Sequence, residues 1–415
     1  MASKHLATTP KPSGTASIKT SLWIAAVLGF VGFVTSFGAH IVAVNLPTYA
    51  KQVGVGVATI GVLIAVYDLA EIIAKPLFGN LADHVGMKKT MLAGIAVFIA
   101  ASLLYPLVDP RMLVVVRFAQ GMGAAALSAV SAALVGTYFT ENRGRAYGIY
   151  NGIKGAGYVV SPVIGGAIVQ KVNFTAIFYA SAAVGAVAFL ISLPLPNLRT
   201  GDRAKLDDDD DLSLKGVVQV MRQRDLLKWY LVIVINMFFV GILFGFLPVY
   251  ISRLGYSPFE SGILISIVAL AYLLVQPFAG WLGDHGDANT TIKVGLALSA
   301  LSIIALPFTS GLSLKIASIV AGIGVGTVWT NNDLIVSRLA KEGRLGATIG
   351  AAGSFKEFGD MVGPLLIGSL SQLLGLRAGF IICGVLGLLC VVLLFKRSAS
   401  SQSALRPTST QKGTA

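Results

Sequence analysis

Long apolar runs recur along this 415-residue chain and limit what it can fold into. Twelve of them lie near residues 22–46, 57–78, 90–108, 111–138, 145–168, 174–194, 229–253, 259–282, 291–309, 313–338, 346–370 and 376–395. A helix needs about 20 apolar residues to cross the hydrocarbon layer. With 55% hydrophobic and only 12% charged residues, the chain has too much apolar surface for one water-soluble core. The sequence therefore predicts an all-α polytopic membrane protein with twelve transmembrane helices.

The basic residues indicate how these spans are oriented. Most of the 32 Lys and Arg residues fall in the two tails and in alternate loops, and positively charged loops stay in the cytoplasm. Both termini are therefore expected to be cytoplasmic. Lys4, Lys11 and Lys19 precede a full-length first span without a cleavage signature, which favours an uncleaved tail. The short loops favour a bacterial inner membrane.

The composition also excludes several partners and chemistries. Orientation and anionic inner-leaflet lipid account for the net charge of +13, so nucleic acid is not an expected partner. Cys383 and Cys390 lie on one helix about 10 Å apart, which is too far for a disulfide, and are expected to pack. Because the sequence shows no metal-ligand cluster, phosphate-binding loop or nucleophile with a base, we expect no metal, no cofactor and no enzymatic activity.

A single long polar segment divides the spans into two sets of six. Its acidic run at 207–211 is read more simply as a solvated linker than as a cation or partner site. The expected organisation is a cytoplasmic N-terminal tail (1–21), a six-helix bundle (22–196), a cytoplasmic linker (197–228), a second six-helix bundle (229–395) and a cytoplasmic C-terminal tail (396–415).

The two sets of spans are related by internal duplication. KPLFGNLADHVG at 75–86 matches QPFAGWLGDHG at 276–286, an offset of 201 residues. A second match, at offsets of 201 and 202, joins ENRGRAYGIYNGIKGAGYVVSPVIGG at 141–166 to EGRLGATIGAAGSFKEFGDMVGPLLIG at 342–368. Parallel six-helix repeats with a substrate site between them, near the bilayer midplane, are the architecture of one large class of transporters.

The segment GNLADHVGMKK at 79–89, between the second and third spans, resembles the signature loop of the major facilitator superfamily. The twelve spans in two halves extend this resemblance to essentially the whole chain. It implies a conformational latch in which Asp83 faces the positive end of a helix and the loop grips the eleventh helix. Gly79 and Gly86 would form a tight turn, and Lys88 would lie near anionic headgroups.

A plain capped turn would explain one copy of this loop but not its recurrence at Gly280 and Asp284 in the second half. His84 and Met87 stand where the family usually has Arg, which predicts a weaker latch.

The fourth span contains a second resemblance, to the superfamily's intramembrane Arg, Gln and Gly motif. Its residues here are Arg117, Gln120 and Gly121. An arginine inside a membrane helix is costly and usually marks a partner or a transport pathway. Arg117 lies near the outer end of its span, so a side chain that reaches the membrane surface is the alternative.

The fifth span resembles the motif that marks drug and proton antiporters within the superfamily. Its residues are Gly148, Gly157, Ser161, Pro162 and Gly165, with Ser161 where Gly is usual. Small residues on one face allow close helix approach and Pro bends the helix, so the interface would be sealed against ion leak. Ordinary small-residue packing is the alternative, because the eleventh span repeats part of the pattern.

Ionisable residues inside the spans are candidates for coupling to an ion gradient. They are Asp68, Glu71, Lys75, Arg117, Lys154, Asp333, Lys356, Glu357 and Asp360. An unpaired charge at the bilayer centre costs about 2.5–3.5 kcal/mol, so pairing or a watery cavity is required. The superfamily fold implies that the second and eleventh helices meet. A carboxylate of the second helix is therefore expected to pair with Lys356 in one access state.

Asp68 is the first choice for a proton site and Glu71 the second. A poorly solvated cavity favours the neutral form of a carboxyl group, which then binds and releases a proton near neutral pH. An interdomain salt-bridge network is the alternative role for both. Lys154 could balance their charge or attract an anionic substrate group. His40 could relay protons or simply pack.

These observations predict a proton-coupled secondary transporter that works by alternating access and exports small amphiphilic compounds. A proton symporter that imports a metabolite, and a membrane sensor that no longer transports, are the alternatives. Tyr67, Trp329 and Phe355 could line a substrate cavity. Protons, a small-molecule substrate and membrane lipids are the expected partners, and the family habit implies a monomer.

Overall fold

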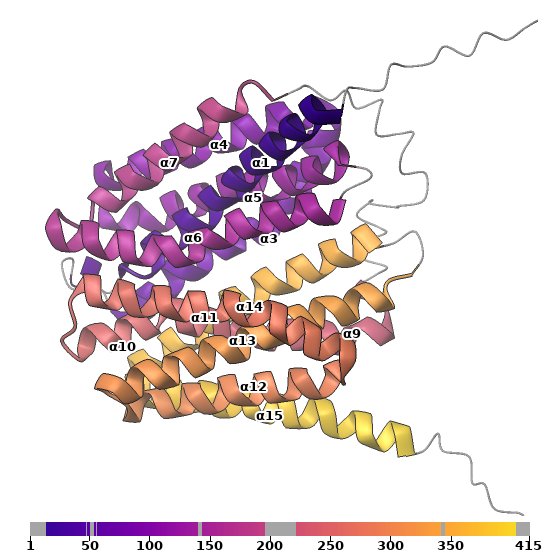
Figure 1. Ribbon diagram of the computed structural model, residues 1–415. Helices are drawn as coiled ribbons and strands as arrows, with labels where there is room; N and C mark the ends of the chain where they lie inside the picture. Colours follow the sequence, from indigo (N-terminus) through magenta and orange to yellow (C-terminus); the bar gives the residue numbers. More distant parts are fainter. Residues whose placement is uncertain are drawn as a thin grey trace, which may run out of the picture.

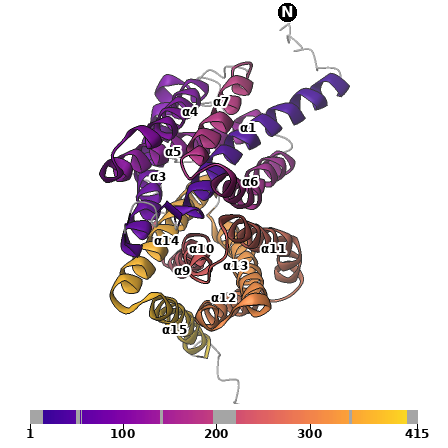
Figure 2. The same ribbon diagram turned by 90° about the vertical axis from the view of Figure 1, so that its left-hand side faces the viewer.

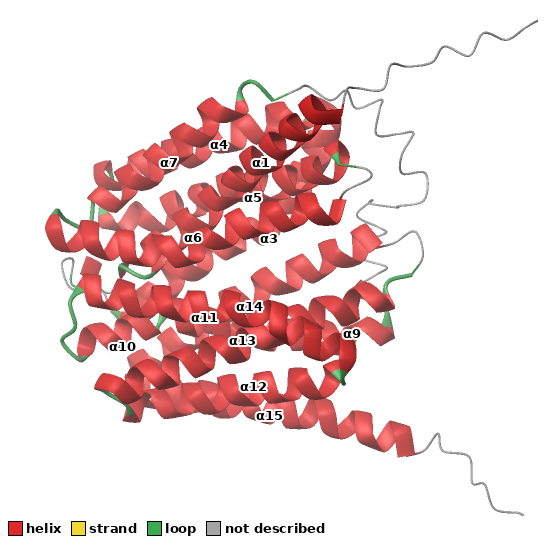
Figure 3. Ribbon diagram, in the orientation of Figure 1, coloured by secondary structure: helices red, strands yellow, loops and turns green. Residues whose placement is uncertain are grey.

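The computed structural model describes residues 14–46, 48–49, 54, 56–139, 143–195, 221–341 and 345–403. These residues form helices and no strand (Figure 3). The first group of helices comprises α1 (Gly14–Ala43), α3 (Val57–Val85), α4 (Met87–Leu104), α5 (Leu113–Tyr138), α6 (Arg143–Lys171) and α7 (Ala176–Ser192). The second group comprises α9 (Arg224–Gly245), α10 (Leu247–Arg253), α11 (Pro258–His285), α12 (Ala288–Ala305), α13 (Gly311–Leu339), α14 (Leu345–Leu374) and α15 (Leu376–Ser403).

Ten spans among the described residues are long and apolar enough to cross a membrane. The apolar helix α7 is shorter, at 17 residues, and α14 is not among the ten and carries three charged residues in its middle. The seventh predicted span is made by α9 and α10 together, with a break at Phe246. Pro248 explains the break, because it has no N–H to donate to the carbonyl of Phe244.

Helix ends differ from the predicted boundaries near the polar segments. Helix α9 begins at Arg224, inside the segment expected to be linker, and α15 continues to Ser403, past the expected start of the C-terminal tail. The acidic run at 207–211 lies outside the described residues.

Single glycines make the turn between two pairs of helices. Gly86, with φ of 105°, separates α3 from α4, and Gly375, with φ of 87°, separates α14 from α15. Glycine adopts such positive φ values without the steric cost that other residues meet. The turn predicted at Gly79 is wrong, because α3 continues through Gly79 to Val85. Helix α11 likewise continues through Gly280.

The helices form two groups, α1 to α7 and α9 to α15, which lie side by side in both views (Figures 1 and 2). The groups contact each other chiefly where α3 packs on α14 and where α6 packs on α11. Helix α1 begins and α15 ends at the same end of the molecule, which we call the terminal end (Figure 1). The opposite end is called the far end.

The two groups approach most closely toward the far end, through glycines that face backbone. Gly61 of α3 packs against the carbonyl of Pro364 in α14, and Gly262 of α11 packs against the carbonyl of Pro162 in α6. These two contacts are related by the offsets of 201 and 202 residues that relate the two halves of the sequence. We call the two interfaces between the groups, α3 with α14 and α6 with α11, the seams. Duplication has therefore given both seams the same glycine-to-carbonyl contact.

Toward the terminal end the groups separate. A Cβ added to Gly148 or Gly152 of α6, or to Gly353 of α14, would meet no atom of the described residues within 4 Å. The structure therefore represents a state in which the halves are closed together at the far end and apart at the terminal end.

Replacing Gly262 with Ala tests the far-end contact. The added methyl group would collide with the Pro162 carbonyl, and overpacking of this kind costs about 1–3 kcal/mol. We expect the thermal unfolding midpoint of the purified protein to fall. Gly353→Ala is the matched control, because it adds a methyl group in open space within a helix and should leave the midpoint unchanged or raise it. Equal effects of the two substitutions would contradict the assignment.

Candidate functional site

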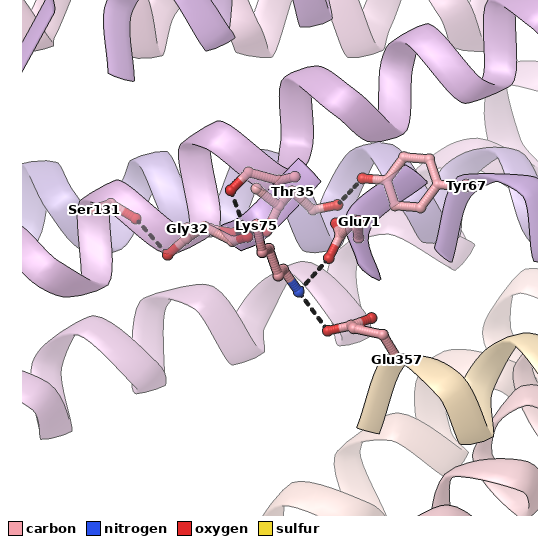
Figure 4. A network of polar contacts seen from close by, with 9 residues as sticks. Gly32, Thr35, Tyr67, Glu71, Lys75, Ser131 and Glu357 are labelled. Atoms are coloured by element: carbon pink, nitrogen blue, oxygen red, sulfur yellow. Dashed lines mark hydrogen bonds and ion pairs between the residues drawn. The ribbon is translucent and has the colours of Figure 1, made fainter. Parts of the chain in front are cut away.

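An ion pair joins the two groups of helices midway along α3 and α14. Lys75 Nζ of α3 lies 2.5 Å from Glu71 Oε2 on its own helix and 2.5 Å from Glu357 Oε1 on α14 (Figure 4). About three quarters of the Lys75 and Glu357 side chains are buried. Lys75 is therefore the cation that holds the α3 and α14 faces together.

In this state the bridge does not use Lys356, the partner expected for one access state. Lys356 does not reach α3; its Nζ lies 2.8 Å from Asp333 Oδ2 and 4.2 Å from the ring centroid of Trp329, both on α13. Lys356 and Glu357 are adjacent on a helix and therefore point in different directions. The inter-half pair thus has its base on α3 and its acid on α14, the reverse of the expected arrangement.

Asp68 lies two turns farther from the terminal end than Lys75. Its side chain is buried, with 7% relative exposure, and its Oδ2 atom has no hydrogen-bond donor among the described residues. Its carboxyl group is within electrostatic reach of the acidic groups of Asp360, Glu357 and Glu71, and of Arg117. A buried ionised carboxylate without a donor is strongly unfavourable, so this position favours a neutral, protonated group or a bound cation.

Asp360 completes the acidic face on α14. A Cβ added to Gly241 of α9 would come within 2.9 Å of Asp360 Oδ1, so the carboxyl group is pressed against that helix. We call Asp68, Glu71, Glu357 and Asp360 the carboxyl cluster. Lys75 contacts two of its members, while Lys154 of α6 acts on Glu71 only at longer range.

Arg117 is buried with 2% relative exposure, so its side chain does not reach the membrane surface as the alternative interpretation required. Its guanidinium group donates to the carbonyls of Leu63 (3.2 Å) and Ala39 (3.2 Å), and to Gln120 Oε1 (2.9 Å). It also lies 4.3 Å from the ring centroid of Tyr67. Arg117 therefore ties α5 to α3 and α1, next to the carboxyl cluster.

A row of rings crosses from one group to the other beside the carboxyl cluster. Successive centroids are 4.3 Å apart for His40 and Tyr158, 6.3 Å for Tyr158 and Tyr272, and 5.7 Å for Tyr272 and Trp329. Phe244 lies 5.3 Å from His40 and 6.2 Å from Tyr158. We call these five residues the aromatic row. His40 Nδ1 is 2.9 Å from the Ser36 carbonyl, which places a proton on that nitrogen.

Only part of this row was predicted from the sequence. Trp329 and His40 were candidates, whereas Tyr158, Phe244 and Tyr272 were missed because bulky residues on membrane helices more often face lipid or pack. The offset of 202 residues could have found Tyr158, which aligns with Asp360. The other two ring candidates pack elsewhere, Tyr67 beneath Arg117 and Phe355 at 4.6 Å on Tyr230.

Lys88, in the first turn of α4, connects this helix to α7. Its Nζ donates to the carbonyls of Leu193 (2.6 Å) and Leu195 (2.7 Å) at the end of α7, where helix carbonyls lack partners. The side chain of Asp83 lies outside the described residues. In the second half, Asp284 pairs with Arg338 of α13 at 3.0 Å, within one group of helices.

Small residues of the fifth-span motif pack against α1. A Cβ on Gly157 would lie 2.8 Å from Ser36 Cβ, and one on Gly165 would lie 2.8 Å from Ile41 Cγ1. Ser161 is fully buried, whereas Gly148 lies in open space near the terminal end. Helix α6 continues through Pro162, whose carbonyl faces α11. The motif therefore seals the α1 and α6 contact and also contributes to the seam between the halves.

The described residues contain no group of three or more His, Cys, Asp or Glu side chains arranged to hold a metal ion. The carboxyl cluster can hold protons or an organic cation, and the aromatic row can pack against an apolar body.

Comparison with known proteins relates the chain to membrane transporters. The model of the Major Facilitator Superfamily matches residues 28–312 and 229–413. The Multidrug resistance protein Stp of Mycobacterium tuberculosis is 24% identical over 85% of this chain and 76% of its own length. The Quinolone resistance protein NorA of Staphylococcus aureus is 26% identical over 83% of this chain and 89% of its own length.

Other relatives have different named substrates. The Riboflavin transporter RibZ of Clostridioides difficile is 23% identical over 75% of this chain and 80% of its own length. Two solved structures share the fold at low identity. A bacterial homologue of the human lysosomal transporter Spinster, in an inward-facing conformation, has a TM-score of 0.76 at 14% identity and covers 95% of this chain and 100% of its own. A POT family transporter has a TM-score of 0.74 at 15% identity, covering 92% and 96% of the two chains.

A double-mutant cycle on Lys75→Met and Glu357→Gln tests the bridge between the halves. Because both groups are largely buried and in contact, we expect a coupling free energy of about 1–3 kcal/mol in the free energy of unfolding. Asp284→Asn with Arg338→Met is the matched control, since that pair is more than half exposed and should couple by less than about 1 kcal/mol. Additive effects at Lys75 and Glu357 would contradict the bridge.

Proposed function

Because the chain belongs to the major facilitator superfamily, and is therefore an integral membrane transporter rather than an enzyme, we propose that it is a proton-coupled exporter of small amphiphilic compounds. It works by alternating access, with Asp68 as its principal proton-binding group and Glu71 as the second. The two groups of helices, α1 to α7 and α9 to α15, are its moving halves, and the segment between α7 and α9 joins them.

The observation that carries this proposal is the buried carboxyl oxygen of Asp68 that has no donor in the described part of the chain. Its neighbours on α3 and α14 are mostly acids, so ionising Asp68 adds a negative charge where several already lie. A proton removes that charge at little steric cost. A cationic group of a substrate would do the same, and the two cannot occupy Asp68 together. Such competition is what exchange of substrate for protons requires.

The aromatic row and the carboxyl cluster together favour an amphiphilic substrate. Aromatic side chains supply apolar contact area, while the carboxyl groups orient a polar or charged part of the ligand. The two features lie close together, because Tyr158 is within electrostatic reach of Asp360, Glu357 and Glu71. One bound molecule can therefore touch both halves of the protein.

Closure at the terminal end is the movement that the cycle requires. The Lys75 and Glu357 bridge lies between the closed far end and the separated terminal end, so it is positioned to reorganise when the halves move. A change in the charge of Asp68 or Glu71 alters the amount of negative charge around Lys75. Arg117, buried next to Asp68, adds a fixed positive charge that limits how readily the site accepts a second cation.

The direction of transport is supported by the relatives named for drug resistance, Stp and NorA, and by the sealed packing of the antiporter-type motif on α6. Import by proton symport is the second candidate, because one relative is named as a transporter of riboflavin, a metabolite. In the proposed orientation both termini face the cytoplasm of a bacterium. A monomer suffices, because one chain supplies both halves of the site.

Proton flux in sealed vesicles tests the proton site. Purified protein is reconstituted with an internal pH dye, and cationic, neutral and anionic compounds are added across an imposed pH gradient. We expect compound-dependent proton movement opposite to the flux of the compound, and its loss in Asp68→Asn, because the amide cannot bind a proton. Asp109→Asn, at an exposed acid near the far end, should retain the flux.

Proton and compound moving in the same direction would establish the symporter instead. Binding of a compound without flux would identify a sensor. Unchanged coupling in Asp68→Asn would move the proton site to Glu71 or another member of the carboxyl cluster.

The latch implied by the superfamily loop has its own test. Asp83→Asn should slow transport without abolishing substrate binding, because it removes the charge that would hold one access state. Turnover and equilibrium binding measured on the same preparation separate the two effects. Normal turnover in this variant would exclude the latch.

A further inference from the structure

A second group of charged and aromatic side chains lies outside the candidate site, at the terminal end of the second half. Here α9 begins, α12 begins and α15 approaches its end, and the three helices pack together (Figures 1 and 2). Lys228 Nζ of α9 lies 4.4 Å from the ring centroid of Phe395 on α15 and 4.7 Å from that of Trp229. Lys293 Nζ of α12 lies 5.1 Å from the same Phe395 ring.

The two ammonium groups therefore converge on one ring, although like charges repel. Neither Lys228 nor Lys293 forms an ion pair within the described residues. Asp287 is within electrostatic reach of both. Its carboxylate oxygens are engaged in capping α12, where they accept hydrogen bonds from the backbone N–H of Asn289 (3.0 Å) and from the N–H and hydroxyl of Thr290 (3.1 and 2.5 Å).

Asp287 therefore stabilises the start of α12, and its hydrogen bonds are made there and not with the two lysines. The hydrogen bond from the Thr290 hydroxyl lowers the pKa of Asp287, which keeps this carboxylate ionised in the cap. One carboxylate against two ammonium groups leaves an excess of positive charge. A ring face attracts a cation by about 0.5–2 kcal/mol, which is insufficient to hold two together unaided. An anion from outside the protein, bound between the two ammonium groups, would neutralise this excess positive charge.

The surroundings indicate which kind of anion. Trp229 and Phe395 are aromatic side chains at the level where the apolar part of α15 ends, and tryptophan favours the boundary between membrane and water. Deeper along α12 and α15, Leu301, Leu389 and Val392 are each 53% exposed. The helices that carry the cationic pair thus also expose apolar side chains deeper in the membrane, along which a hydrocarbon chain can lie.

We propose that Lys228, Lys293 and Phe395 form a binding site for the phosphate of an anionic phospholipid, whose acyl chains lie along α12 and α15. The phosphate diester would accept hydrogen bonds from both ammonium groups and relieve their repulsion. Basic pockets between membrane helices bind lipid headgroups in this way. Bound lipid would join the start of α9 to α12 and α15, and so strengthen the second half of the protein.

Native mass spectrometry of the full chain in detergent tests the site. The protein is titrated with phosphatidylglycerol, with phosphatidylcholine of the same acyl chains, and with soluble glycerol phosphate. We expect one tightly retained phosphatidylglycerol, weaker retention of phosphatidylcholine, and no retention of glycerol phosphate. Its affinity should fall about fivefold in Lys228→Gln or Lys293→Gln and roughly thirtyfold in the double variant, since each basic residue contributes similarly.

Two further variants keep the result interpretable. Lys341→Gln removes an exposed lysine near the terminal end of α13 and should leave the affinity unchanged. Lys228→Arg with Lys293→Arg keeps both charges and should retain phosphatidylglycerol, which distinguishes loss of charge from loss of folding. Equal retention of the two lipids by the wild-type protein, or an affinity that the double Gln variant leaves unchanged, would overturn the proposal. Retention of glycerol phosphate alone would identify a soluble anion as the ligand instead.

Discussion

Lys75 can neutralise only part of the negative charge that surrounds it between α3 and α14. It contacts Glu71 and Glu357, while Asp68 and Asp360 lie beside them without a basic partner in contact among the described residues. In a region of low solvation, such an excess of carboxyl groups is stable only if protons or another cation are present. In the proposed cycle, the α3 and α14 contact therefore changes with what is bound there, and with it the position of one half relative to the other.

The fold could be predicted from the sequence because the spans are long and the duplication is explicit. Hydropathy predicted where the helices lie, charge predicted their orientation, and the repeated motifs predicted that the two halves are similar. Helix ends at polar segments were harder to predict, because helix formation does not stop where hydropathy falls. Helix α3 continues through Gly79, and α9 begins before the apolar run. Helix α3 ends only at Gly86, where the backbone takes a positive φ.

The candidate site was predictable in composition but not in pairing. Sequence spacing places Asp68, Glu71 and Lys75 on one helix face, and the structure keeps them together. Spacing could not tell whether Lys356 or Glu357 turns toward α3, because adjacent residues differ by about 100° around a helix and the rotation of α14 depends on its packing against several helices. The partners of Arg117 could not be predicted either, because the carbonyls of Leu63 and Ala39 are backbone groups that no side-chain motif indicates.

Duplication left the two seams alike in backbone and different in side chains. Both use a glycine against a carbonyl at the far end, but Glu71 and Asp360 on the α3 and α14 seam align with Tyr272 and Tyr158 on the other. The α3 and α14 seam carries carboxyl groups that can bind protons, whereas the phenol groups of the other seam carry no charge at neutral pH. We therefore expect proton binding to act asymmetrically: the halves would rotate about the α6 and α11 side as a hinge, and separate first along α3 and α14.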